Sequence, residues 1–531
     1  GSDNSSIPEV IGRPDALFDP LDDAAIAAAM RRGLEDAAWR DSLRTSGQAQ
    51  ALRFSWDETG LRALRAIEAL HERTAAGPRT APRATPAAAP ARPRLALVSP
   101  VPPAQSGIAD YCAELLPVLA WHYAIEIVCD QRQVALPEAV AGLPVHSTEW
   151  FEAHAGEFDR IVYQFGNSEF HARMFDLLRR HRGVVVLHDF FLSGALHWMD
   201  GRRWPGAFAE ALMASHGTEG VEFERDHGRG AALFRYPLNR FVIERASGVI
   251  VHSAYSMEAA TRWYGPGTSR HWHRIPHLRV LPQALDRAGA RQALGLQEDD
   301  FLVCSFGQIA ETKQTHRLLE TWLRSGMAQD KRCRLVLVGK NAPAGYGERI
   351  AELAQGGDGR IAITGFADRP AFERYLAAAD VAVQLRGMSR GETSGAVLDC
   401  LAHGTAVIAN ANGSNAEYPH GVLYRLEDEY ADDDLLTALL RLRAQPQERH
   451  ALGLEGRRWV AERHDPQAVA LQYQAAIEAA AARPHAQGYW DLIDRLAALE
   501  AAPSEADLLA AATALAATAQ VTGPISMSLR A

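Results

Sequence analysis

After residue 93 the sequence carries two series of short apolar runs, and each run is separated from the next by a helical pattern. The first series lies at 94–100, 124–129, 160–164, 184–187 and 248–252, and the second at 301–306, 334–338, 360–364, 380–385 and 405–409. Continuous apolar runs of this length are typical of strands buried on both faces, and their alternation with helices indicates parallel sheets. The sequence therefore predicts an α/β protein with two Rossmann-like, doubly wound parallel-sheet domains that face a cleft.

Composition and charge narrow the class of protein. The 531 residues suffice for two or three domains, and 47% hydrophobic with 23% charged residues is ordinary for a globular chain. The net charge of −10 argues against a nucleic-acid partner, which would require a basic face. No apolar run reaches the ~18 residues of a membrane span, no signal peptide is visible, and the five cysteines have neither metal nor redox spacing. We therefore expect a cytoplasmic protein.

The first part of the chain resembles a later part of the same chain. Residues 3–72 match it at an offset near 408, with 4–9 on 412–417 and 67–69 on 477–479. A similarity at this separation indicates a duplicated unit and not a short-period repeat. Chance similarity between two alanine-rich helical stretches is the alternative.

These features divide the chain into five parts. Thr74 to Pro93 is rich in proline and alanine and has no apolar periodicity, which predicts a semi-extended linker. The pair Gly1-Ser2 is typical of a cloning remnant, which favours a longer native protein. The expected parts are the end of an upstream copy (1–73), the linker (74–93), an N-terminal Rossmann-like domain (94–285), a C-terminal one (286–465) and a helical tail (466–531).

The stretch RGETSGAVLDCLAHG, from Arg390 to Gly404, lies between two apolar runs and reads as loop and helix between strands. Thr393, Ser394 and Gly395 would start this helix, where free backbone N–H groups favour a phosphate or diphosphate. Glu392 and Asp399 would flank the anion and, because they repel phosphate, would accept hydrogen bonds from sugar hydroxyls. An acidic helix cap with one solvated aspartate is the alternative.

Further polar residues and glycines follow the other predicted strands, where ligands of open parallel sheets bind. They are Ser106 and Gly107, Gln164 and Asn167, His188 and Asp189, Gly307 and Lys313, and Gly339 and Lys340. Each has an ordinary alternative: a structural His-Asp pair, solvated lysines or turn glycines. Their common position at one cleft favours a binding site. The basic cluster 179–182 is read as a solvated helix end, with an anionic membrane or lipid phosphate as the alternative contact.

Four motifs together resemble retaining glycosyltransferases of the GT-B fold, family 4 (glycosyl transferases group 1). They are SPVPPAQSGIADYCAELLPVLA (99–120), VVVLHDFF (184–191), the FG…K loop (306–313) and ETSGAVLDCLAHG (392–404). The resemblance covers 94–480 as a full copy and 3–72 as the end of another, an upstream glycosyltransferase-like domain. It implies transfer of a sugar from a nucleoside diphosphate with retention at the anomeric carbon, no bound metal and no cofactor besides the donor, and a crossover helix over 466–480.

The resemblance also implies roles for individual residues. His188, Lys313 and Glu392 would be catalytic: His188 near the reacting carbon, Lys313 on the diphosphate and Glu392 on sugar hydroxyls. The donor would be bound by Ser106, Gly107, Gly307, Gln308, Lys313, Lys340, Thr393, Ser394, Gly395 and Asp399. Gln164, Asn167 and Asp189 would contact the acceptor or support the residues that do.

The sequence departs from the family pattern at two positions. Six residues lie between Glu392 and Asp399, where two glutamates with seven residues between them are usual, and Gln308 stands where a phosphate-binding arginine is usual. Losing one charge-assisted contact typically costs a few kcal/mol. Gln308 therefore slows the enzyme, is compensated by another cation such as Lys340, or marks a weakened module that binds glycan or scaffolds a tandem partner.

The implied reaction needs positive charge and aligned N–H dipoles at the leaving diphosphate, for which Lys313 and the helix start at Thr393 are the candidates. Double displacement through a carboxylate nucleophile is the mechanistic alternative, and a GT-B epimerase or phosphorylase is a third reading of the fold. A tandem arrangement suits polysaccharide synthesis, so we expect a glycan or lipid-linked glycan acceptor such as bacterial O-antigen. Mannose is the expected sugar, from a GDP- or UDP-linked donor, with contact at the inner face of the cytoplasmic membrane as an alternative location.

Overall fold

The computed structural model describes residues 1–4, 7–51 and 92–482. Two compact units divide the chain, Gly1–Ala91 and Arg92–Ala531. Most of the predicted linker, residues 67–69 of the proposed repeat and the tail beyond 482 lie outside the described residues.

The described part of the first unit is a small helical structure. Its elements are α1 Ile7–Ile11, the 3-10 helix η1 Pro14–Ala16, α2 Asp23–Glu35 and α3 Ala37–Ala51. Asp22 caps α2, because its side chain accepts hydrogen bonds from the N–H groups of Ala24 and Ala25. None of these helices has a fully buried residue.

The second unit begins with a seven-stranded sheet in which every strand pairing is parallel. The strands are β1 Arg94–Val98, β2 Ala124–Val128, β3 Val145–His146, β4 Arg160–Phe165, β5 Val184–Leu187, β6 Gly248–Val251 and β7 His273–Arg274, in the order β3-β2-β1-β4-β5-β6-β7. Along β1, Leu95 and Leu97 enter one core and Ala96 and Val98 enter the other. The sheet is therefore buried on both faces, as its continuous apolar runs predict.

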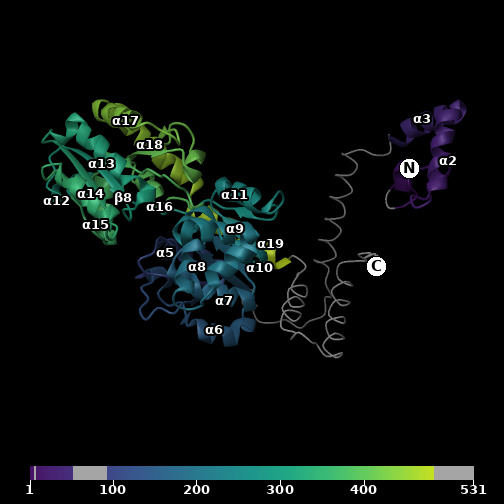
Figure 1. Cartoon of the computed structure of the whole chain (residues 1–531), viewed down its shortest axis with the longest axis horizontal. Helices are drawn as coiled ribbons and strands as arrows, with labels where there is room; N and C mark the ends of the chain where they lie inside the picture. The colour runs from purple at the N-terminus through teal and green to yellow at the C-terminus, as the bar shows by residue number, and fades with distance from the viewer. Residues whose placement is uncertain (5–6, 52–91, 483–531) are drawn as a thin grey trace, which may run out of the picture. The chain divides into compact units, whose positions relative to one another are not determined.

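Helices connect these strands. They are α5 Gly107–Leu119, α6 Thr148–His154, α7 Ala172–Arg180, α8 Ser193–Asp200, α9 Ala207–Arg235, α10 Arg240–Arg245 and α11 Ala254–Tyr264, with 3-10 turns at Glu138–Val140, Ala155–Glu157 and Glu169–His171. Figure 1 labels the helices of this domain, α5 to α11. Ser106 caps α5, since its Oγ accepts from the N–H of Ile108. This first helix therefore starts at the carboxyl end of β1, at the edge of the sheet where ligands bind.

A second, six-stranded parallel sheet follows. Its strands are β8 Phe301–Phe306, β9 Cys333–Val338, β10 Ile361–Ile363, β11 Val381–Val383, β12 Ala406–Asn410 and β13 Tyr424–Leu426, in the order β10-β9-β8-β11-β12-β13. The helices are α12 Arg287–Ala293, α13 Thr315–Arg324, α14 Tyr346–Gln355, α15 Arg369–Ala378, α16 Gly395–Ala402, α17 Asp432–Ala444, α18 Pro446–Arg463 and α19 Pro466–Ala482, with 3-10 turns at Glu311–Lys313, Gly326–Ala328 and Gly413–Glu417. The predicted fold class, two parallel-sheet α/β domains, is confirmed.

The last described helix, α19, leaves the second domain and packs on the first. Val469, Ala470 and Ile477 share a buried core with the strands β1 and β2. Tyr473 also hydrogen-bonds Tyr111 of α5, with 2.6 Å between the two hydroxyl oxygens. This helix therefore ties the two domains together at the end of the described chain.

Within residues 1–4, 7–51 and 92–482, we find no helix whose length and apolar character would carry it through a bilayer.

Candidate active site

The helix α16 starts two residues later than the sequence suggested. Its first residue is Gly395, and Ser394 is the N-cap, with its Oγ accepting from the N–H of Val397 at 3.4 Å. The Thr393 hydroxyl is buried and has no hydrogen-bond partner among the described residues. The first-turn N–H groups and this hydroxyl therefore form a set of donors beside the loop, as a phosphate site requires.

Lys313 lies at the carboxyl end of β8 in a tight arrangement with Gly307. Its Nζ is 2.6 Å from the point where a Cβ on Gly307 would sit, and Gly307 has a φ of +98°. A side chain at 307 would therefore both strain the backbone and displace the ammonium group. Burial first, and then the positive charge of Arg386, lower the pKa of Lys313 to about 7 against the opposing effect of Glu392.

Arg386 is a second cation at this place, and the sequence reasoning did not select it. It lies three residues after β11, and its Nη1 contacts Glu392 Oε1 at 2.7 Å. Its backbone N–H and carbonyl are both hydrogen-bonded to the side chain of Asn410. The next residue, Gly387, donates its N–H to the carbonyl of Thr312, which ties this loop to the turn that carries Lys313. The position could have been found by the same rule as the others, because it stands at the end of a strand.

Glu392 is held by this cluster and not by the helix. Besides Arg386, its Oε2 accepts from the N–H of Arg390 at 2.6 Å, and its carbonyl accepts from the Ser414 hydroxyl. A carboxylate has about four acceptor positions, so lone pairs remain for a ligand hydroxyl. The structure thus brings Lys313, Arg386 and Glu392 together, with the start of α16 in the same loop.

The first domain meets this loop directly. The N–H groups of Phe190 and Phe191 both donate to the carbonyl of Arg390, and the Ser256 hydroxyl donates to that of Gly391. A Cβ on Gly391, whose φ is +82°, would lie 2.4 Å from Phe190 Cβ. The predicted motif VVVLHDFF and the loop before α16 are therefore in contact across the two domains.

His188 and Gln164 form a buried pair under this contact. His188 Nε2 and Gln164 Oε1 are 2.6 Å apart, and the imidazole also lies against the rings of Tyr111 and His252, with centroids 4.8 and 4.9 Å away. Burial lowers the pKa of His188 well below its usual value, and His252 adds to the effect. The ring is neutral at pH 7, and the buried Gln164 orients it.

Asp189 lies near the loop before α16, while the side chain of Asn167 caps a helix. Burial first, and then the charge of Glu392, raise the pKa of Asp189 to about 6, while the hydrogen bond from the N–H of Asn167 opposes the rise. The Asn167 Oδ1 accepts from the N–H groups of Gly194 and Ala195 in the first turn of α8. Asn167 therefore caps a helix and positions Asp189.

We expect Asp189→Asn to stabilise the protein in a pH-dependent way. A carboxyl whose pKa is raised on folding contributes most to stability below its unfolded pKa, and this contribution is lost as pH rises through about 6. Neutralisation should therefore raise the thermal midpoint at pH 8, by an equivalent of about 1 to 3 kcal/mol, and hardly change it at pH 4. The exposed Glu429→Gln is the control, and an equal shift at both pH values would contradict the assignment.

Asp399 lies apart from this cluster. Its Oδ1 is 3.1 Å from Arg279 Nη1, and the same nitrogen is 3.1 Å from Glu114 Oε1 of the first domain. Arg279, which the sequence reasoning also missed, is buried in the segment that joins the two domains. Asp399 thus takes part in an ion network between domains.

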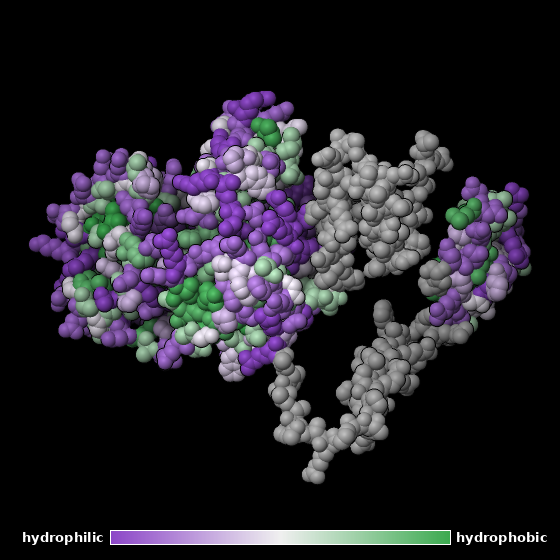
Figure 2. Space-filling view, turned by 90° about the horizontal axis from the view of Figure 1, so that it is seen from below, coloured by the Kyte–Doolittle hydropathy of each residue, from purple (hydrophilic) through white to green (hydrophobic). Residues whose placement is uncertain are grey.

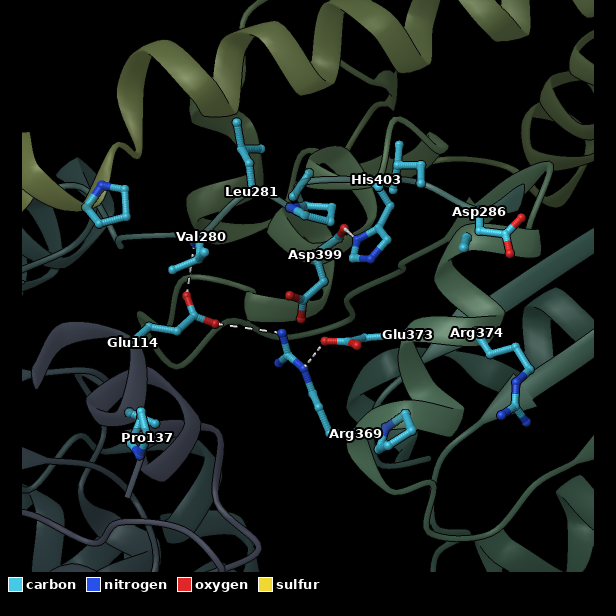
Figure 3. A pocket seen from close by; sticks show the side chains of 18 of the residues that line it. Glu114, Pro137, Val280, Leu281, Asp286, Arg369, Glu373, Arg374, Asp399 and His403 are labelled. Atoms are coloured by element: carbon cyan, nitrogen blue, oxygen red, sulfur yellow. Dashed lines mark hydrogen bonds and ion pairs between the residues drawn. The ribbon is translucent and has the colours of Figure 1, made fainter. Parts of the chain in front are cut away.

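A cavity of about 990 Å³ adjoins this network (Figure 3). Asp399, His403, Glu114, Arg369 and Glu373 are among its lining residues, whereas Lys313, Arg386 and Glu392 are not. Figure 3 shows Arg369 between Glu114 and Glu373. The two acids predicted to flank one anion therefore belong to different surroundings.

The remaining predicted residues lie in exposed or half-buried loops. Gly107 has open space around it at the start of α5, and Ser106 is the cap before it. Gln308 and Lys340 are exposed after β8 and β9. The Ile309 N–H donates to the Lys340 carbonyl, so these two loops run side by side.

The side chains of the basic cluster 179–182 contact other residues of the first domain. Arg179 stacks on Trp204 at 4.7 Å from the ring centroid, Arg180 contacts Glu152 at 2.9 Å, and Arg182 donates to the carbonyl of Arg245. Three of its side chains thus pack on the first domain. The alternative of a membrane contact stays a prediction.

The fold of this chain is similar to those of several solved protein structures. The HepE protein of Anabaena, solved with UDP, superposes with a TM-score of 0.52 at 16% identity, covering 73% of this chain and 100% of that one. Sucrose-phosphate synthase of Thermosynechococcus elongatus gives 0.51 at 21%, covering 72% and 98%, and WaaG, a glycosyltransferase involved in lipopolysaccharide biosynthesis, gives 0.50 at 16%, covering 72% and 98%. These likenesses define the GT-B fold.

Sequence comparison adds the family. Residues 300–445 match the family Glycosyl transferases group 1, so the chain carries a glycosyltransferase domain of that group. The serotype-specific mannosyltransferase WbdA of Escherichia coli is 42% identical over 59 residues, 11% of this chain and 7% of that protein. The O-antigen chain mannosyltransferase B of Escherichia coli is 36% identical over 69 residues, 13% of this chain and 18% of that protein. The chain thus matches a small part of these relatives.

Proposed function

We propose that this chain transfers a hexose, with mannose as the first candidate, from a nucleoside diphosphate sugar to a growing bacterial surface glycan, with retention of configuration. The observation that supports this most is the meeting of Lys313, Arg386 and the start of α16 at the carboxyl edge of the second sheet. Two cations and unpaired N–H groups at one place suit a diphosphate leaving group. The short mannosyltransferase matches support the choice of sugar.

The proposed step begins when the bond between the anomeric carbon and the diphosphate oxygen breaks. The electron pair leaves with the diphosphate, whose charge Lys313, Arg386 and the helix start stabilise without a metal. The acceptor hydroxyl attacks from the face that the diphosphate leaves, and its proton passes to the departing oxygen. Glu392 would hold sugar hydroxyls with its free lone pairs, and His188 stays the candidate contact near the reacting carbon.

The test is a panel of GDP- and UDP-linked hexoses, each measured for binding by calorimetry and for slow hydrolysis or transfer by release of diphosphate. The proposal expects one member to bind and to turn over. Binding without any turnover would favour a weakened module that holds glycan or supports a partner domain, a candidate that the exposed Gln308 favours. Binding of none would remove the donor assignment.

Donor binding should depend on pH through Lys313. Because its pKa is about 7 in the free protein, the ammonium form that attracts diphosphate disappears above that value. Affinity for the preferred nucleoside diphosphate should therefore fall about fivefold to tenfold between pH 7.5 and 8.5. Calorimetry in buffers of different ionisation heat should also show proton uptake. Equal affinity at the two pH values would contradict the role.

A further inference from the structure

The backbone of the first unit repeats the end of the second domain. Ser2 and Phe18 form an isolated parallel bridge, and Asn410 and Leu426, 408 positions later, are paired in the same way between β12 and β13. The hydrogen bond that follows each pair is also repeated: the Asp3 N–H donates to the Phe18 carbonyl, and the Ala411 N–H to that of Leu426, both at 2.9 Å. The same residue pairing and the hydrogen bond that follows it therefore occur once in the first unit and once in the second domain.

The helices repeat with the same fidelity. α2 Asp23–Glu35 corresponds to α17 Asp432–Ala444 with both ends shifted by 409 positions, and α3 starts at Ala37 as α18 starts at Pro446. Arg40 donates from Nη1 to the carbonyl of Gly33, and Arg449 donates from Nη1 to the carbonyl of Leu442, the position equivalent to Gly33. A chance resemblance of alanine-rich helices would not reproduce a side-chain contact between helices.

The two copies differ in what covers them. Tyr430, Leu435 and Leu439 are buried in the second domain, in a core shared with its sheet and with α13. Their equivalents are Leu21, Ile26 and Met30, of which Leu21 is 93% and Met30 64% exposed. Figure 2 shows apolar side chains on the surface of this unit. Met30 also lines a cavity of about 660 Å³.

We propose that residues 1–51 are the C-terminal segment of a second donor domain. The face with Leu21, Ile26 and Met30 packs against the parallel sheet of that domain and against its helix equivalent to α13. The second domain of this chain shows what this partner must contain. It needs an apolar parallel sheet whose last strand resembles β12, and an amphipathic helix like α13 that packs against Leu21 and Ile26, the equivalents of Tyr430 and Leu435. Ser2 would then be the last residue of that β12-like strand, and its bridge to Phe18 would correspond to the pairing of Asn410 with Leu426. This second donor domain is independent of the catalytic assignment above.

The experiment extends the full chain by a sheet of the required kind. Residues 286–409 of this same sequence are placed directly before Ser2 in place of Gly1, so that Ser2 takes the position of Asn410. Amide hydrogen exchange is then followed in peptides from α2 and α3 with mass spectrometry. Exchange should slow about tenfold or more relative to the chain as it stands, because the helices gain a buried face.

Two variants of the extended chain make the readout specific. Met30→Asp places a charge on the apolar face that contains Leu21, Ile26 and Met30, and should abolish the slowing of amide exchange. Ala28→Asp places the same charge on the same helix at the position equivalent to the exposed Thr437, and should leave the slowing intact. Unchanged exchange in the extended chain, with the added sheet folded or not, would overturn the proposal, and so would a slowing that Met30→Asp does not affect.

Other occupants of this face give their own outcomes in the unextended chain. Slow exchange of α2 in a monomer would mean that another part of the chain already covers it. A dimer in sedimentation equilibrium that Met30→Asp dissociates would mean that a second copy covers it. Either result would overturn the proposal.

Discussion

Lys313→Ala is expected to lower the turnover of the preferred sugar nucleotide about 100- to 1000-fold, which is the usual effect of removing one preorganised group that stabilises a leaving anion. The Nζ lies beside Gly307, where no side chain intervenes, and Arg386 is the other charge of the cluster. The rate of diphosphate release measures the effect.

This loss cannot be attributed to unfolding. The lowered pKa of Lys313 means that its charge opposes folding below about pH 7, so the alanine variant should be at least as stable there. Lys331→Ala, an exposed lysine just before β9 at the opposite edge of the sheet, is the matched control and should keep its activity. Near-normal turnover of Lys313→Ala would refute the role.

Arg279→Met is expected to cause the largest loss of stability. Arg279 is buried between Glu114 of the first domain and Asp399 of the second. Its removal leaves two buried carboxylates without their common partner, which typically costs about 3 to 5 kcal/mol. In a chain of this size the thermal midpoint should fall on the order of 10 °C.

The pH dependence of this loss identifies its cause. Burial already raises the pKa of Glu114, and Arg279 opposes that rise. Without the arginine the Glu114 carboxyl takes up a proton more readily, so the loss should be smaller at pH 5 than at pH 8. Arg458→Met removes an exposed ion pair with Glu455 and should change the midpoint little. An equal fall of the thermal midpoint in both variants would show that the ion network between the domains stabilises the protein no more than an exposed ion pair does.

Most of the fold could be predicted because ten of the thirteen described strands lie in continuous apolar runs, whereas the short strands β3, β7 and β13 have no such run and were not predicted. The same signal located the loops after β8 and β11, and with them Lys313 and Glu392. Arg386 obeys the same rule, but the sequence gives no sign that distinguishes one arginine after a strand from a solvated side chain. The start of α16 was placed two residues early, since Thr393, Ser394 and Gly395 are all acceptable near a helix start and the capping bond of Ser394 decides between them.

Contacts between distant segments could not be read from the sequence. Glu114, Arg279 and Asp399 meet only after two domains and the segment between them have come together. The closeness of Asp399 and Glu392 in the sequence predicts one shared site, yet the Asp399 carboxylate pairs with Arg279. Asn167 likewise was selected for its position after a strand, while its oxygen caps α8. In each case the partner was chosen by tertiary packing.

The most direct measurement is a calorimetric titration of GDP and of UDP into the protein, into Lys313→Ala and into Arg386→Ala at pH 7. We predict that one nucleotide binds the unaltered protein and binds each variant at least about tenfold more weakly, as expected when one charge-assisted contact to a phosphate is lost. Equal affinity in all three proteins would contradict the claim that these two cations receive the diphosphate.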